Sequence, residues 1–126
     1  MRKIAAAFAA TIGLSGVATA DDVMGLQLPL GCAGGEPFWG LTIKDGRQAT
    51  YVWDNEPHPW KVKSIDRAAG RITTWRVTFE GKSRYAFIFD EGTHTCSDSD
   101  GDEPLAYGIL LQDGEGLLRG CCNPKQ

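Results

Sequence analysis

The sequence predicts an all-β fold, a small antiparallel β-barrel or sandwich of about seven to eight strands. Period-two alternation of apolar and polar residues recurs at the spacing of roughly 8–12 residues that is typical of such folds. Turn dipeptides that contain glycine separate these segments, and after residue 20 no stretch keeps a helical period beyond about two turns. The chain has 126 residues, 42% hydrophobic and 23% charged, so we expect one ordinary globular domain.

Each expected strand is a segment with one apolar or aromatic face. Arg84–Asp90, for example, puts Tyr85, Phe87 and Phe89 on a common side, and aromatic or β-branched residues at period two are strand signals. The other segments of this kind are, in order, Trp39–Lys44, Gln48–Asp54, Trp60–Asp66, Thr74–Glu80, Leu105–Leu111 and Leu117–Cys122. Glycine supplies the positive φ that hairpin turns require. The turn dipeptides are Asp45-Gly46, Ala69-Gly70, Glu80-Gly81 and Asp113-Gly114.

The first 20 residues have the pattern of a cleaved secretory signal. Arg2 and Lys3 precede 17 uncharged residues, which end in Ala18-Thr19-Ala20. A retained anchor is the alternative, but this segment is short for a hydrocarbon core of about 30 Å. A lipoprotein is disfavoured because Pro29–Cys32 is a poor lipobox. We therefore expect residues 21–126 to form a single domain in the periplasm or outside the cell.

Four cysteines follow the signal, and an even number in an oxidising compartment predicts two disulfides, with three possible pairings. A bond between the adjacent Cys121 and Cys122 needs a strained ring, so each is expected to pair elsewhere. On a strand Leu117–Cys122 these neighbours point to opposite faces. We favour Cys32–Cys122 inside the barrel and Cys96–Cys121 near its rim. Zinc is the weaker alternative, because no Cys-x-x-Cys spacing occurs.

Charge and motif content exclude several function classes. Without residues 1–20 the chain has 11 basic and 16 acidic residues, a net charge near −5, which disfavours nucleic acid and anionic membrane surfaces. Gly-x-Ser-x-Gly, His-Glu-x-x-His and phosphate-binding glycine motifs are absent. We expect a monomer without enzymatic activity, a membrane span or a cofactor. A small enzyme with a spatially assembled triad stays an alternative.

Two stretches contain candidate binding residues. In the Glu-Pro-Phe-Trp stretch, Glu36 and Trp39 are candidates to hold a ligand at the barrel rim, and a corner of the core is the alternative. Asn55–Trp60 is expected to be a stiff loop with an aromatic tip, and such loops often serve in recognition. Its candidates are His58 and Trp60, and a solvated histidine is the alternative for the former.

An acidic segment is the candidate metal site. Asp98, Asp100, Asp102 and Glu103 offer several carboxylate oxygens, the ligands that Ca²⁺ prefers. The glycine and glutamate spacing of an EF-hand is absent. The alternative is a solvated acidic loop held by the Cys96 disulfide, so calcium is a weak expectation and no other cofactor is implied.

Three short motifs together resemble a known pattern. Gly35–Trp39, Cys96 with Asp98, and Gly120–Cys122 are similar to those of a family of small bacterial periplasmic proteins and lipoproteins, often labelled membrane or META-like proteins. That family's acidic turn contains a methionine, which is absent here, and Asp100–Leu105 also departs from its pattern. The resemblance implies a small β-barrel in the cell envelope and no assigned activity.

A second similarity, at the level of the fold alone, is to the bacterial inhibitors of c-type lysozyme, which are also small exported barrels with disulfides. An acidic protein is steered towards a basic enzyme. We therefore predict an exported, non-enzymatic β-barrel module that binds an envelope protein or a small ligand. The alternatives are an inhibitor of lysozyme or another cell-wall hydrolase, a calcium-binding protein and a small enzyme.

Overall fold

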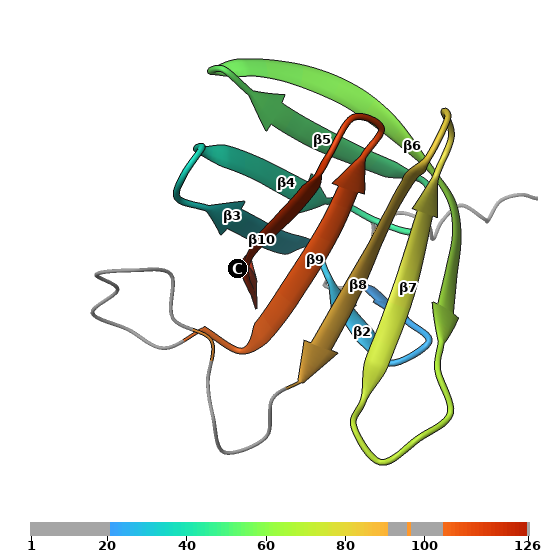
Figure 1. Ribbon diagram of the computed structural model, residues 1–126. Coiled ribbons are helices and arrows are strands. Elements are labelled where there is room, and N and C mark those ends of the chain that lie inside the picture. Colours follow the sequence, from blue (N-terminus) through green and yellow to red (C-terminus); the bar gives the residue numbers. More distant parts are fainter. Residues whose placement is uncertain (1–20, 91–95, 97–104, 126) are drawn as a thin grey trace, which may run out of the picture.

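Eight antiparallel strands close into a barrel, as the computed structural model shows for residues 21–90, 96 and 105–125 (Figure 1). The order around the barrel is β10-β3-β4-β5-β6-β7-β8-β9, and a separate hairpin, β1–β2, precedes it. The described residues contain no helix capable of spanning a membrane. The strands are β1 (Asp21–Val23), β2 (Leu26–Leu28), β3 (Leu30–Gly34), β4 (Trp39–Ile43), β5 (Gln48–Trp53), β6 (Glu56–Arg67), β7 (Thr74–Phe79), β8 (Arg84–Asp90), β9 (Tyr107–Asp113) and β10 (Leu117–Pro124).

The inward faces of the strands form one core. Alternation places every second side chain inside, and an eight-stranded barrel is just wide enough for side chains to fill. Side chains therefore pack the interior. The large side chains of this core include Trp39, Leu41, Ile43, Tyr51, Trp60, Trp75, Phe79, Ile88, Ile109 and Leu111.

On β8 the aromatic face points outward. Ala86 and Ile88 are the buried residues, while Tyr85 and Phe87 are each 38% exposed and contact one another edge to face at 5.8 Å between ring centroids. The interior already contains several large aromatic side chains, so a small residue such as Ala86 fits inside this wall. The period-two pattern therefore located the strand but could not tell which face is inside.

The segment Asn55–Trp60, predicted to be a loop, is instead the first part of β6. The turn lies one step earlier, at Asp54 and Asn55, whose φ angles are 58° and 64°, as a type I′ hairpin turn requires. Pro57 and Pro59 lie where β6 extends beyond its partner β7 (Figure 1). Proline is tolerated on such an edge because no ladder partner needs its missing N–H.

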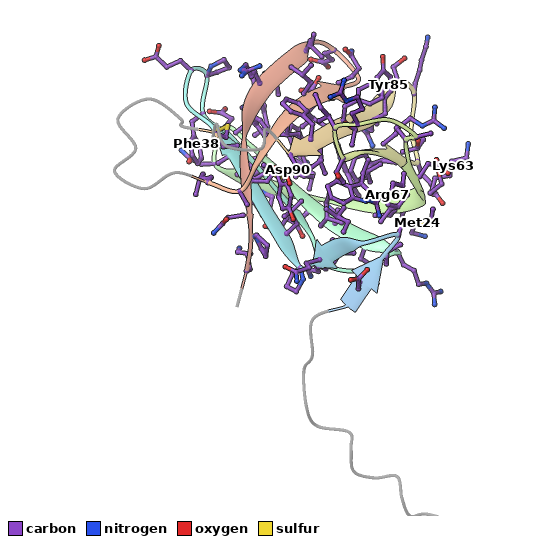
Figure 2. All side chains as sticks on the ribbon, turned by 90° about the horizontal axis from the view of Figure 1, so that it is seen from below. Met24, Phe38, Lys63, Arg67, Tyr85 and Asp90 are labelled. Carbon is purple, nitrogen blue, oxygen red and sulfur yellow. A yellow bond between two sulfur atoms is a disulfide. The ribbon has the colours of Figure 1, made fainter. Side chains whose placement is uncertain are left out.

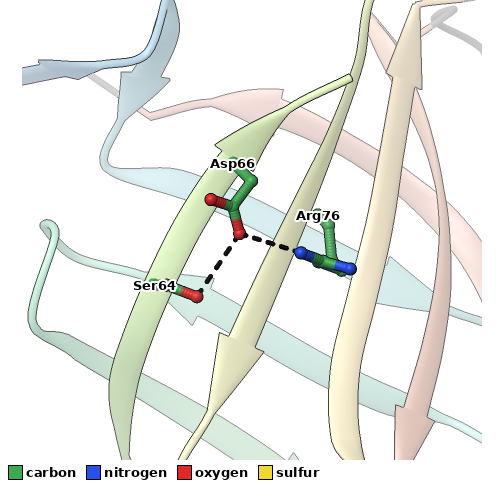
Figure 3. A network of polar contacts seen from close by, with 3 residues as sticks. All are labelled: Ser64, Asp66 and Arg76. Carbon is green, nitrogen blue, oxygen red and sulfur yellow. Dashed lines mark hydrogen bonds and ion pairs between the residues drawn. The ribbon is translucent and has the colours of Figure 1, made fainter. Parts of the chain in front are cut away.

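A β-bulge changes the alternation along β6. The register with β7 shifts between Val62 and Ser64, so both Val62 and Ile65 point into the core. On the outer face Asp66 accepts a hydrogen bond from Ser64 at 3.5 Å and pairs with Arg76 at 3.3 Å (Figure 3). Both members of the ion pair are about half exposed, so it stabilises the fold by only about 0–1 kcal/mol.

The β1–β2 hairpin seals one end of the barrel, which we call the sealed end. Leu26 and Leu28 are buried in the core, and the Trp75 indole N–H donates to the Met24 carbonyl at 2.8 Å. A Cβ on Gly25, which follows Met24 in the hairpin turn, would lie 3.1 Å from Arg67 Nη1 at the end of β6; Figure 2 labels Met24 and Arg67. The sequence-based strand assignment missed this hairpin, because its strands have three residues each.

Two disulfides have the pairing that we favoured. Cys32–Cys122 joins directly opposed residues of β3 and β10 inside the barrel, with a sequence separation of 90. Cys96–Cys121 has a separation of 25. Cys121 lies opposite Ala33 on the outer face of the wall, in the middle of β10 and not near the rim as expected. Because the Cys32 sulfur is bonded to Cys122, it does not carry a lipid in this structure.

Candidate functional site at the open end of the barrel

Successive strands run in opposite directions, so every second connection lies at the same end of the barrel. The β3–β4, β5–β6, β7–β8 and β9–β10 connections therefore meet opposite the sealed end, at what we call the open end. Strands β5 and β6, the start of β8, the end of β9 and the β9–β10 turn line a cavity of about 340 Å³ at this end. Its lining residues are Tyr51, Trp53, His58, Pro59, Trp60, Arg84, Asp113 and Glu115.

An aromatic ladder leads from this cavity into the core. Trp53, 39% exposed, stacks with Tyr51 at 6.4 Å between ring centroids. Tyr51 contacts Trp60 at 4.4 Å, and Trp60 contacts the buried Phe79 at 5.1 Å. The inner rungs are packed, so Trp53 is the ring of this ladder that is most available to a ligand.

A hydrogen bond spans the open end between strands that are not neighbours. The Tyr51 hydroxyl, on β5, donates to Asp113 Oδ2, on β9, at 2.7 Å. Asp113 Oδ1 accepts the backbone N–H groups of Glu115 and Gly116, each at 2.9 Å. The β9–β10 turn thus fixes the orientation of the Asp113 carboxylate, and this carboxylate fixes the position of the Tyr51 hydroxyl.

These contacts shift the pKa values of both groups. Burial alone raises the Asp113 pKa, but the hydrogen bonds from Tyr51 and from the backbone N–H groups of Glu115 and Gly116 outweigh it and lower that pKa. Burial, followed by the bond to Asp113, raises the pKa of the Tyr51 phenol. At neutral pH the pair is therefore a neutral donor bonded to a carboxylate.

Arg84 supplies the positive charge of the cavity. Its guanidinium carbon lies 4.8 Å from the centroid of the Trp60 ring, a cation–π contact, and Nη1 donates to the Glu80 carbonyl at 3.4 Å. Arg84 is the cross-strand partner of Asp113. It shares the inward parity of Ala86, so a charged residue stands at the end of an otherwise apolar face.

The candidates on β6 have different positions from those expected. His58 is exposed and lines the cavity opposite Tyr51, its cross-strand partner. Trp60 is only 5% exposed, because Tyr51, Phe79 and Arg84 cover it. The expectation of an aromatic loop tip at Trp60 was therefore wrong, although its ring still forms part of the cavity wall.

Trp39 is fully buried, so the expectation of a rim anchor was wrong and the core-corner alternative describes it. Two glycines make room for its indole. A Cβ on Gly34 would lie 2.8 Å from Trp39 Cε2, and one on Gly120 would lie 2.8 Å from Trp39 Cζ2, closer than real Cβ contacts come. A glycine just before the Gly-Glu-Pro-Phe-Trp motif and the glycine of the Gly-Cys-Cys motif thus build one packing site around Trp39.

Glu36 is exposed on the β3–β4 loop, beside but not in the main cavity. The same loop borders a smaller cavity of about 210 Å³, where Pro37 and Phe38 meet the β5–β6 turn at Asp54. Trp53 lines both cavities. The two stretches singled out in the sequence therefore do lie together at the open end.

The proposed metal ligands Asp98, Asp100, Asp102 and Glu103 lie outside the described residues. Within the described ranges, no group of three or more histidine, cysteine, aspartate or glutamate side chains is arranged to hold a metal ion.

Sequence reasoning missed several residues of the cavity. Trp53 and Tyr51 were assigned to an apolar strand face, and Asp113 to a turn. The signal that could have found them is parity: Arg84 and Asp113 stand at inward positions of β8 and β9, where a charge has no place in a closed core. Charged inward residues at strand ends indicate the mouth of a barrel.

Comparison of the chain with family models, with curated proteins and with solved structures finds no match. Membership in the family that the motifs resemble therefore stays a prediction.

Proposed function

We propose that this chain is an exported, non-enzymatic protein of the cell envelope that binds a partner or small ligand at the open end of its barrel. The observation that carries the proposal is the open cavity itself. Trp53 and His58 are exposed in it, and the Tyr51–Asp113 bond holds its polar wall in place. Aromatic faces with a few fixed polar groups are typical of ligand sites.

Two disulfides support export, because such bonds persist in oxidising compartments. Together with the N-terminal signal pattern, in which Arg2 and Lys3 precede an uncharged stretch, the disulfides favour the periplasm or the cell exterior.

The pKa shifts of Tyr51 and Asp113 favour a binding role for the cavity over a catalytic one. An acid–base catalyst works best with a pKa near the working pH. Here the Asp113 pKa is lowered and the Tyr51 pKa is raised, so both move away from neutrality. The pair is suited to accept and hold hydrogen-bonding groups.

Retention from an envelope extract tests the proposal. The oxidised protein would be immobilised next to a Trp53→Ala/His58→Ala variant and an outer-face control, Tyr85→Ala/Phe87→Ala. We expect at least one species to be retained by the native protein and the control but lost from the open-end variant. A blank column, or equal retention by all three, would overturn the proposal.

The charge of the open end favours one second candidate, an inhibitor of lysozyme or another basic cell-wall hydrolase. The four connections and adjoining strand ends carry six acidic and two basic side chains, a net charge of −4. Charge complementarity of this kind steers association. The test is lysozyme activity at micromolar excess of the protein, where full activity would remove this candidate.

A further inference from the structure

The open end of the barrel is acidic. The open end has a net charge of −4, from six acidic and two basic side chains. This count covers residues 35–38, 53–58, 80–84 and 113–116.

Carboxylates flank the exposed indole. Glu56 is the cross-strand partner of Trp53, which places its Cβ about 4.5–5.5 Å from that of the tryptophan on the same face. Asp113 and Glu115 line the cavity that Trp53 also lines, whereas Glu56 is not among its lining residues. Asp113 Oδ2 has lone-pair capacity beyond its bond from Tyr51. The surroundings of Trp53 are therefore rich in acceptors.

The cavity already contains one contact between a cation and the face of a tryptophan ring. The Arg84 guanidinium lies on the face of Trp60, one aromatic step deeper than Tyr51. A cation on an indole face is stabilised by the ring quadrupole. Trp60 is covered by Arg84, whereas Trp53 presents its ring to the cavity.

We infer that the open end binds a cationic group, a guanidinium or an ammonium, which lies against Trp53 and pairs with the carboxylates of the cavity. The negative charges of Asp113 and Glu115 in the cavity, together with that of Glu56 beside Trp53, outweigh the single positive charge of Arg84. This inference rests on the proposed function, because it names the ligand class of the same site.

A matched pair of ligands tests the charge. N-acetyl-L-arginine amide carries a guanidinium, and N-acetyl-L-citrulline amide replaces it with a neutral urea of nearly the same shape. In calorimetric titrations at low salt we expect the arginine compound to bind about tenfold more tightly. Equal affinity would overturn the cation inference and leave the open end standing as a binding site.

Matched variants test the position. Trp53→Ala is expected to abolish the preference and Trp53→Phe to restore part of it, since phenylalanine is a weaker cation partner. Glu115→Gln is expected to reduce both the affinity and its dependence on salt. Phe87→Ala is the control, because Phe87 has the same exposure as Trp53, 38% against 39%, on the outer wall. A preference that survives Trp53→Ala would overturn the site.

A protein side chain and a free compound are two sources of the same cation. Hen lysozyme, a basic protein, serves as the second probe. Tight binding of lysozyme that is lost in Trp53→Ala would support a side chain as the source, and binding of the free compound alone would support a small ligand. If neither probe binds, the inference is overturned, while the retention experiment decides the proposed function independently.

Discussion

The two ends of the barrel differ in how their side chains are packed. At the sealed end, Leu26 and Leu28 enter the core, and the Trp75 indole is bonded to the Met24 carbonyl. At the open end, Trp53 stays exposed beside a cavity, and polar groups from distant strands meet across the mouth.

This difference separates stability from recognition. Apolar burial at the sealed end stabilises the closed barrel, while the open end keeps charged and aromatic groups in contact with solvent. Substitutions at the two ends should therefore have effects of different kinds, and the following predictions test that separation.

The largest expected effect lies at the sealed end. Leu26→Ala removes a fully buried side chain, and we expect it to lower the free energy of unfolding by about 2–5 kcal/mol. Chemical denaturation measures this change. Leu117→Ala is the matched control, because Leu117 is 65% exposed and its loss should cost no more than about 0.5 kcal/mol. Similar losses for both variants would contradict the description of the hairpin as part of the core.

A smaller effect is expected at the open end. Tyr51→Phe removes the hydroxyl that donates to Asp113 while keeping the ring. We expect a loss of about 1–2 kcal/mol in the free energy of unfolding, as for a hydrogen bond to a charged group. A variant as stable as the native protein would show that the bond does not stabilise the fold.

The two ends of the barrel can be compared through the pKa of one aspartate at each end. Asp45, in the β4–β5 turn, and Asp113 both have lowered pKa values, Asp45 chiefly because the backbone N–H groups of Arg47 and Gln48 bond to it. A lowered pKa adds stability that is present above the ordinary carboxyl value, about 4, and is lost as pH falls through the folded-state pKa. In carboxyl-carbon NMR titrations of Tyr51→Phe, we expect the Asp113 pKa to rise and that of Asp45 to stay unchanged. An unchanged Asp113 pKa would show that the hydrogen bond from Tyr51 does not lower it.

Alkaline titration gives the smallest effect. Burial raises the pKa of Tyr51 and that of Tyr107 above the ordinary tyrosine value of about 10. The stability linked to these groups is present below that pH and is lost as pH rises through the higher folded-state values. Phenolate absorbance should therefore show late titration, reduced but not abolished in Tyr51→Phe. An unchanged late phase in that variant would contradict the burial of the Tyr51 hydroxyl.

The fold was predictable from the sequence because most of the strands alternate apolar and polar residues and most of the turns between them contain glycine. Three features were not. The β1–β2 strands are too short for a periodic signal, the Asp54-Asn55 turn contains no glycine, and the bulge after Val62 reverses the alternation that Trp60 begins. Local pattern also cannot say which face of β8 is inside.

The candidate site was predictable only in part. His58 was a candidate because it lies between two prolines in the sequence, and Glu36 was expected near the barrel rim. Tyr51 and Asp113 lie 62 residues apart on strands that do not pair. Their contact depends on barrel closure, which no short motif encodes.

The most direct test uses the four tryptophan indoles as reporters of position. In ¹⁵N-labelled protein titrated with N-acetyl-L-arginine amide, the Trp53 indole signal and the amides of residues 113–116 should shift most. The Trp75 indole, bonded to Met24 at the sealed end, should stay in place. Larger shifts at Trp75 than at Trp53 would contradict the assignment of binding to the open end.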